Sequence, residues 1–359
     1  MGCDGTNVNT CWKNGAIRRI EKKLGRPVQW FICLLHFIEL PLRALFLKID
    51  GQTDGPNSFS GPIGKGLKYC LSKPVVNYKK IHCNLPDIDL NILSHDQRYL
   101  FKICQAIQSG TCSEELSASE PGTLNHARWL TCANRILRSY ISEPKPSEGL
   151  KLLVEFILKV YASQWFSIRK NKSVKDGSRH FFKTIELTRY LPSDYLEVVN
   201  ESIRRNAYFA MPENILLSMM TDEDVNVRQE ALTKIIDARQ LARDGQLSAS
   251  KLAVMNFHAL HYKDMIDWSS INIIFPPVIR AMSNEELEKK LLSNNVCTDW
   301  EFCAYPCHTV AVERLVKLVT EASLKVCGHD NRDGFIRATL ASRQQMKKFD
   351  TKKNFSSFS

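Results

Sequence analysis

Asp4 belongs to the first group of residues that could do chemistry. Residues 2–10 have the pattern of a strand tip that runs into a Gly/Asn-rich turn and then a helix. A carboxylate at the tip of a buried strand is well placed to hold a catalytic metal ion. Only three residues precede Asp4, which leaves no room for a strand. We therefore expect an N-terminally cut piece of a longer protein, or a relic of one.

Cys33 and His36 complete this first group. Residues 28–33 are short, apolar and rich in β-formers, which predicts a buried strand, and a helix is expected over 36–48. Asp4, Cys33 and His36 would then meet at one edge of a sheet, a usual position for sites in α/β proteins. The alternative is structural, with Cys33 as a small buried hydrophobe and His36 as a helix-cap residue.

The second group comprises residues 126–129 together with Arg135. An exposed Trp129 next to Arg128 could stack on a base or clamp a phosphate. The alternative is that Trp129 anchors its helix inside a bundle.

The third group is residues 306–314, which run into an apolar helix. Glu313 and Arg314 lie in the first turns of that helix, so Glu313 is a candidate carboxylate ligand. The alternative is a Glu–Arg neighbour pair on a helix surface, without a further role.

The elements that must position these groups are mostly helical. Residues 12–24 are amphipathic, with apolar residues on one side and Arg and Lys on the other, and Gly25 is placed to end that helix. Residues 50–65 carry turn signals and predict a loop, in which 61–65 lack the spacing of a phosphate-binding loop. The remaining predicted helices fall within 95–296 and include a stretch that is apolar nearly all round, 150–168.

Composition narrows the class of partner. The chain has 359 residues, and its 49 Lys and Arg against 38 Asp and Glu give a net charge of +11. This balance favours an anionic partner, nucleic acid before an anionic membrane, unless the protein is simply basic. Twelve scattered cysteines without a signal peptide predict reduced thiols in the nucleus or cytoplasm. Polar residues interrupt the most apolar early stretch, so no membrane span is expected.

Taken in order, the three groups resemble the catalytic domain of hAT-type DNA transposases, which is an RNase H-like fold interrupted by a large helical insertion. The resemblance covers most of the chain, although each motif is short. Asp4-Gly5 is similar to the region of the family's second catalytic Asp, and Cys33-x2-His36 is similar to its Cys/Asp-x2-His element. Arg128-Trp129 resembles the Arg-Trp pair that opens the insertion. Val312-Glu313-Arg314 resembles the helix that carries the family's last catalytic acid.

The resemblance implies phosphoryl transfer on double-stranded DNA. Asp4 and Glu313 would be two of three carboxylates that hold two Mg²⁺ or Mn²⁺ ions about 3.5–4 Å apart, which activate the attacking oxygen and stabilise the leaving oxygen. His36 would support a ligand or contact a phosphate. DNA contacts, or support of the insertion, would come from Arg128 and Trp129, with Arg314 as a further DNA contact.

The resemblance also implies that a part of the site is missing. The family's first catalytic Asp and its first strands would lie upstream of Met1, and half of a sheet leaves an open edge. We therefore expect no transposase activity from this polypeptide alone, a nuclear location, and a possible homo-oligomer formed through the C-terminal segment.

The expected fold class is an α/β remnant plus mostly α, with a partial RNase H-like sheet interrupted by an all-helical insertion. The expected domains are a partial core (1–69), a helical insertion (70–300), a C-terminal helical segment (301–345) and a basic disordered tail (346–359). Two other functions remain open. One is a non-enzymatic helical protein–protein interaction protein, and the other is a membrane-surface protein that uses the basic face of 16–24.

Overall fold

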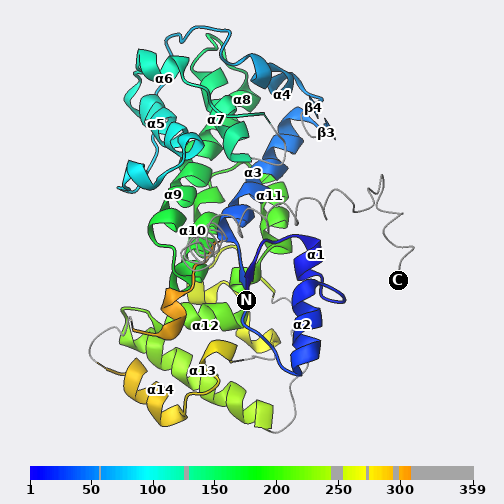
Figure 1. The fold of residues 1–359 in the computed structure, drawn as a ribbon, viewed down its shortest axis with the longest axis vertical. Helices are drawn as coiled ribbons and strands as arrows, with labels where there is room; N and C mark the ends of the chain where they lie inside the picture. The colour runs from blue at the N-terminus through cyan, green and yellow to red at the C-terminus, as the bar shows by residue number, and fades with distance from the viewer. Residues whose placement is uncertain (56–57, 125–128, 244–253, 272–274, 294–298, 309–359) are drawn as a thin grey trace, which may run out of the picture. The chain divides into compact units, whose positions relative to one another are not determined.

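Helices make up most of the computed structural model, which describes residues 1–55, 58–124, 129–243, 254–271, 275–293 and 299–308. Strands form two short pairs (Figure 1), so the expected mostly helical class is confirmed. Contacts group residues 1–309 into one compact unit and 310–359 into a second, which lies outside the described residues. The expected boundaries at 69/70 and 300/301 stay predictions. The expected basic tail also lies outside the described residues.

The N-terminal part of the chain alternates short strands and helices. Its elements are β1 (Gly2–Cys3), α1 (Asn7–Thr10), α2 (Ala16–Leu24), β2 (Phe31–Ile32), α3 (Leu34–Asp50), β3 (Thr53–Gly55), β4 (Ser58–Phe59) and α4 (Pro62–Gly66), with a 3₁₀ turn at Leu67–Tyr69.

The rest of the described chain is helical. Its α-helices are α5 (His95–Ser109), α6 (Glu114–Ala118), α7 (Trp129–Tyr140), α8 (Glu148–Phe156), α9 (Ser163–Lys170), α10 (Gly177–Thr188), α11 (Ser193–Arg205), α12 (Pro212–Met220), α13 (Val225–Arg243) and α14 (Asn284–Leu291). A π-helical segment, Ile157–Ala162, joins α8 to α9. Short 3₁₀ turns lie at Leu90–Ile92, Val174–Asp176, Tyr208–Ala210, Tyr262–Asp264, Trp268–Ser270, Pro277–Ile279 and Glu301–Ala304.

β1 and β2 form a parallel pair in which Gly2 faces Phe31 and Cys3 faces Ile32. The Phe31 N–H donates to the Met1 carbonyl at 2.8 Å, and the Cys33 N–H donates to the Cys3 carbonyl at 2.8 Å. The expectation that no strand fits before Asp4 is therefore wrong, because two residues suffice when a second segment offers a parallel edge. β2 is also shorter than the expected strand 28–33. Two strands of this length do not define an RNase H-like sheet, so that part of the fold class stays a prediction.

The amphipathic stretch 12–24 forms a shorter helix than expected. α2 begins at Ala16 after Gly15 and ends as expected at Gly25, whose φ of +64° is favourable for glycine and whose N–H bonds the Glu21 and Lys22 carbonyls. Of its apolar residues, Ile17 is fully buried, whereas Ile20 and Leu24 are 37% and 50% exposed. The apolar side of α2 is thus only partly covered by the core.

Residues 50–65 contain more regular structure than the predicted loop, since they form the antiparallel β3–β4 pair and the start of α4. The buried Asp50 carboxylate accepts hydrogen bonds from the Ile63 N–H at 2.8 Å and the Gly64 N–H at 2.6 Å. These are the free N–H groups at the start of α4, where an anion would bind. An internal carboxylate therefore occupies the position that a phosphate would take.

The expected buried helix over 150–168 is confirmed. α8, the π-helical segment and α9 run without a break, and most of their side chains are inaccessible to solvent. α3 packs against this long helical run and also against α11, so helices from the N-terminal part and from the later region share one core (Figure 1).

We expect Gly177→Ala to destabilise the protein by about 1–3 kcal/mol, the usual range for overpacking. A Cβ at this first position of α10 would lie 2.2 Å from Cε1 of Phe209, which is only 2% exposed. Urea denaturation measures the change. Gly66→Ala in α4 is the control, because no described atom lies within 4 Å of its Cβ position. Equal stability of the two variants would contradict the packing described here.

Candidate functional site

Asp4 stands directly after β1 and organises the turn that follows. Its Oδ1 accepts hydrogen bonds from the Thr6 N–H at 3.1 Å, the Thr6 hydroxyl at 2.6 Å and the Asn9 side-chain amide at 2.7 Å. Partial burial raises the pKa of Asp4, but these hydrogen bonds and the nearby His36 outweigh it and hold the pKa below its ordinary value. Asp4 is therefore ionised at neutral pH.

His36 lies in the first turn of α3, next to the Asp4 turn. Burial lowers its pKa below the ordinary value, Asp4 opposes this shift, and Arg43 adds to it. A Cβ on Gly5 would lie 3.4 Å from Cδ2 of His36, which places the turn after Asp4 in van der Waals reach of the imidazole. An ionised carboxylate and a neutral imidazole thus follow the carboxyl ends of two adjacent parallel strands, β1 and β2. Their role as a functional site stays a prediction.

Cys33 is buried and precedes α3, as expected for the end of β2. The cavity beside Cys33 and His36 has a volume of only about 10 Å³ and is lined mainly by apolar side chains. This is room for one water molecule at most. The arrangement therefore does not enclose a small-molecule substrate, and any ligand of Asp4 and His36 would approach from the surface.

The beginning of the third predicted group lies against the first. The Leu34 N–H donates to the Cys307 carbonyl at 2.9 Å, and the Cys307 N–H donates to the Lys172 carbonyl at 2.7 Å. The Val174 N–H donates in the same way to the Tyr305 carbonyl at 2.9 Å. The segment that leads toward Glu313 is therefore fixed at the start of α3, although Glu313 and Arg314 themselves lie outside the described residues.

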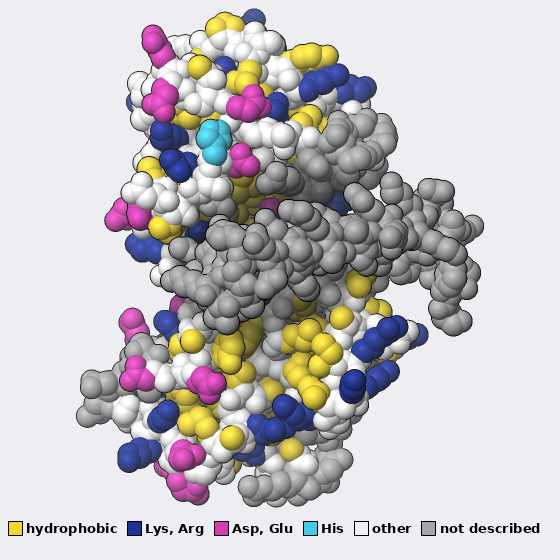
Figure 2. Space-filling view, viewed as in Figure 1, with side chains coloured by type: hydrophobic (Ala, Val, Ile, Leu, Met, Phe, Trp, Pro, Cys, Tyr) yellow, Lys and Arg dark blue, Asp and Glu magenta, His cyan; other side chains and the backbone are white. Residues whose placement is uncertain are grey.

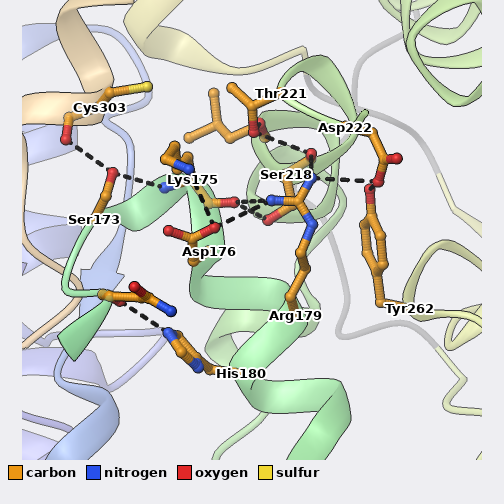
Figure 3. A network of polar contacts seen from close by, with 12 residues as sticks. Ser173, Lys175, Asp176, Arg179, His180, Ser218, Thr221, Asp222, Tyr262 and Cys303 are labelled. Carbon is orange, nitrogen blue, oxygen red and sulfur yellow. Dashed lines mark hydrogen bonds and ion pairs between the residues drawn. The ribbon is translucent and has the colours of Figure 1, made fainter. Parts of the chain in front are cut away.

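A polar network at the start of α10 lies next to these backbone contacts of residues 305–307 and helps to hold them (Figure 3). The Ser173 hydroxyl donates to the Cys303 carbonyl at 2.8 Å. Arg179 pairs with Asp176 and Asp222, each at 3.3 Å. The Tyr262 hydroxyl donates to the same Asp222 carboxylate at 2.6 Å. Because each charge is paired, the partly buried network fixes the α10 start without leaving an isolated ion.

His308 closes the described part of the third group. It is 2% exposed, and neither ring nitrogen has a hydrogen-bond partner among the described residues. Burial lowers its pKa to about 4, and the nearby Arg169, Lys172 and His180 act in the same direction. His308 is therefore a neutral, buried imidazole, a state that its sequence position alone does not indicate.

The described residues do not complete a metal site. They contain no group of three or more His, Cys, Asp or Glu side chains placed to hold an ion. Asp4 and His36 alone do not fit Mg²⁺, which prefers six mainly oxygen ligands. The predicted metal pair of Asp4 and Glu313 stays a prediction, because Glu313 lies outside the described residues.

The second predicted group does not form a nucleic-acid surface in the described residues. Trp129 is 3% exposed and packs edge-on against Phe46 with ring centroids 5.5 Å apart. Arg135 is buried too and donates to the carbonyls of Gly122 and Leu67. Both side chains anchor α7, which corrects the expected base contact of Trp129. Arg128 lies outside the described residues.

A network that the sequence did not reveal holds β2 in place. The buried Asn214 amide donates to the Trp30 and Tyr208 carbonyls, both at 2.9 Å, and its Oδ1 accepts from the Gln29 amide at 2.7 Å. On the other side, Glu21 Oε1 accepts from the Trp30 indole N–H at 3.0 Å. No local pattern could identify Asn214 as a partner, because it lies 184 residues from Trp30.

Glu213, next to Asn214, carries a carboxyl that is not paired. Its Oε2 is inaccessible and has no hydrogen-bond partner among the described residues, although the residue as a whole is only partly buried. Burial raises its pKa to about 7, against the weaker opposing effects of its own N–H and of Arg18. A cavity of about 30 Å³, lined by Glu21 and Glu213 among others, adjoins this carboxyl.

Comparisons with the models of known families, with curated proteins and with solved structures find no match for this chain. The site is therefore interpreted from its own residues. None of the described helices has the length and apolar character needed to cross a bilayer.

We expect Asp4→Asn to lower the pKa of His36 further, because it removes the negative charge that stabilises the imidazolium. Arg43→Gln should shift the same pKa upward, since it removes a repelling cation. The imidazole C2–H resonance followed against pH measures both shifts, and His36→Gln assigns it among the nine histidines. An unchanged His36 titration in Asp4→Asn would show that the two groups do not meet.

Glu213 should make stability fall as pH rises from about 4.5 to about 7, because its pKa is raised in the folded state and the folded protein then binds the proton more tightly than the unfolded chain. The shift corresponds to roughly 3 kcal/mol. In Glu213→Gln this contribution should vanish, and urea denaturation at several pH values measures it relative to wild type. The exposed Glu197→Gln in α11 is the control and should leave the profile unchanged. Identical profiles for wild type and Glu213→Gln would contradict the prediction.

Proposed function

We propose that this chain is a DNA-binding protein derived from a transposase-like catalytic core, and that it does not carry out strand transfer alone. The observation that supports this most is the meeting of Asp4 and His36 at the carboxyl ends of two parallel strands, with the segment 305–307 close by at the start of α3. The first and third groups thus approach each other although they are about 300 residues apart.

We propose a phosphate-containing ligand that reaches the site from the surface. The cavity beside His36 is too small for a metabolite, and the net charge of +11 favours a polyanion. Catalysis by two metal ions needs several carboxylates around the ions. Asp4 with a neutral His36 supplies one, so we propose that binding without cleavage is the property of this chain. A nuclear location and self-association through 301–345 are further parts of the proposal.

A non-enzymatic helical interaction protein is the second candidate. The burial of Trp129 and Arg135 favours it, because both residues serve the packing of α7 instead of a ligand. In that case Asp4 would serve only to cap the turn formed by Thr6 and Asn9.

Fluorescence anisotropy with a labelled 30-base-pair duplex tests the proposal. We expect binding that weakens linearly on a plot of log affinity against log salt, because each phosphate contact releases counterions. In parallel, the same duplex incubated with Mg²⁺ or Mn²⁺ should stay uncut. Absence of binding at low salt would favour the interaction protein. Cleavage that is lost in Asp4→Asn would overturn the non-catalytic part.

A further inference from the structure

The segment that contains α1 and α2 is strongly basic. Residues 5–38 include six Lys and Arg but only one acid, Glu21. Five of the six cations are exposed, and none has a carboxylate within 4 Å in the described part of the chain: Lys13, Arg19, Lys22, Lys23 and Arg26. The charge of this surface is therefore not neutralised by its own residues.

Glu21 does not offset this charge because it is turned toward the core. Its Oε1 accepts from the Val28 N–H at 3.1 Å and from the Trp30 indole at 3.0 Å, and its Oε2 pairs with Arg18 at 2.6 Å. The Arg18 guanidinium also lies over the Trp30 ring at 4.9 Å. One cation and the single acid are thus used to hold α2 on the core.

Three of the remaining cations lie on the opposite side of α2. Ile17 and Glu21, one turn apart, face the core, while Arg19, Lys22 and Lys23 project from the solvent side of the same helix. Figure 2 shows Lys and Arg side chains gathered over α2. One strand of a duplex carries a phosphate for about every 3.4 Å of helix axis, so side chains in adjacent turns of α2 can reach more than one of them.

Trp12 adds a second kind of contact at the end of this surface. Its side chain is 73% exposed, with the Lys13 ammonium 4.9 Å from the ring centre. The turn that carries it is tight, since the Gly15 N–H donates to the Cys11 carbonyl at 2.8 Å and a Cβ on Gly15 would lie 2.6 Å from Cys11 backbone atoms. The indole is therefore presented on a fixed turn next to unpaired cations.

We propose that the surface formed by Trp12, Lys13, Arg19, Lys22, Lys23 and Arg26 binds single-stranded nucleic acid, with the cations on the phosphates and Trp12 stacked on a base. An aromatic ring beside a cationic track is the usual arrangement for single strands, whose bases are free to stack. A duplex offers phosphates to the cations but no unpaired base to Trp12. The inference is independent of the proposed function, because it does not use Asp4 or His36.

An anionic membrane is the other polyanionic surface that basic helices bind. A helix that lies on a bilayer inserts its apolar side and keeps its cations at the headgroups. In α2 the apolar side is only partly open, because Ile17 is buried in the core while Ile20 and Leu24 are partly exposed, and the cations are on the outer side. The geometry therefore favours a phosphate backbone over a bilayer.

Fluorescence anisotropy of the full chain with labelled 20-nucleotide oligo-dT and oligo-U tests the inference. Trp12→Ala should weaken single-strand binding about tenfold or more, as expected for the loss of one stacked base. The double variant Lys22→Gln/Lys23→Gln should reduce the slope of log affinity against log salt by about 1.4, because two phosphate contacts are removed. Circular dichroism confirms that each variant is folded.

Matched controls are available in the same chain. Tyr69→Ala removes another exposed aromatic residue, 57% exposed with Lys68 at 4.8 Å over its ring. The double variant Lys79→Gln/Lys80→Gln removes two adjacent exposed lysines and gives the same change in net charge. Both controls should bind single strands as wild type does.

The outcomes separate this inference from the proposed function. The inference is overturned if wild type does not bind single strands, if Trp12→Ala binds them as wild type does, or if controls and test variants weaken equally. Lysine-dependent binding to phosphatidylserine vesicles without binding to oligonucleotides would also overturn it in favour of a membrane. Duplex binding tests the proposed function separately. If the α2 variants bind the duplex as wild type does, the proposed function is unaffected, and the oligonucleotide results alone decide the single-strand inference.

Discussion

The Asn214 side chain joins α12 to the segment that leads into β2. β1 and β2 are two residues long, and an isolated strand pair of that size is not stable in water. Asn214 at the start of α12 donates to the backbone of Trp30 and accepts from Gln29, which satisfies polar groups that the strand pair cannot satisfy itself. A buried polar group without a partner is costly, so this position favours one placement of β2 against the helices. The position of Asp4 and His36 follows from it.

Two arginines, the buried Arg135 and the partly buried Arg179, have a comparable role in the helical part. Arg135 and Arg179 each bond carbonyls from distant segments and each pair with a carboxylate. Arginine suits this position because its planar group has five donors and stays charged. An arginine that the sequence suggests for a nucleic-acid surface, such as Arg135, can therefore be used entirely for internal contacts. The cations of α2 differ, because the single acid near them is occupied by the core and they keep their charge at the surface.

The environments of Asp4 and His36 set their charge states in opposite ways. Hydrogen bonds from Thr6 and Asn9 stabilise the Asp4 carboxylate, while burial disfavours the His36 imidazolium. The result is a carboxylate anion near a neutral imidazole, which is the protonation state that metal ligands need. Glu213 shows the contrasting case, in which burial outweighs the effect of its own N–H and raises the pKa of the carboxyl to about 7.

The sequence by itself determined the local features. These are the helical class, the end of α2 at Gly25, the buried run from α8 to α9, and the position of Asp4 and His36 after two neighbouring strands. Each follows from short-range periodicity, capping residues or strand polarity. The tertiary structure decided which polar residues are accessible. The sequence pattern around Trp129 and Arg135 allowed a surface or a core position, and only long-range packing against Phe46 and Leu67 placed them inside. The anchoring by Asn214 was equally hidden, because a hydrogen bond between residues 184 positions apart leaves no periodic signal in the chain.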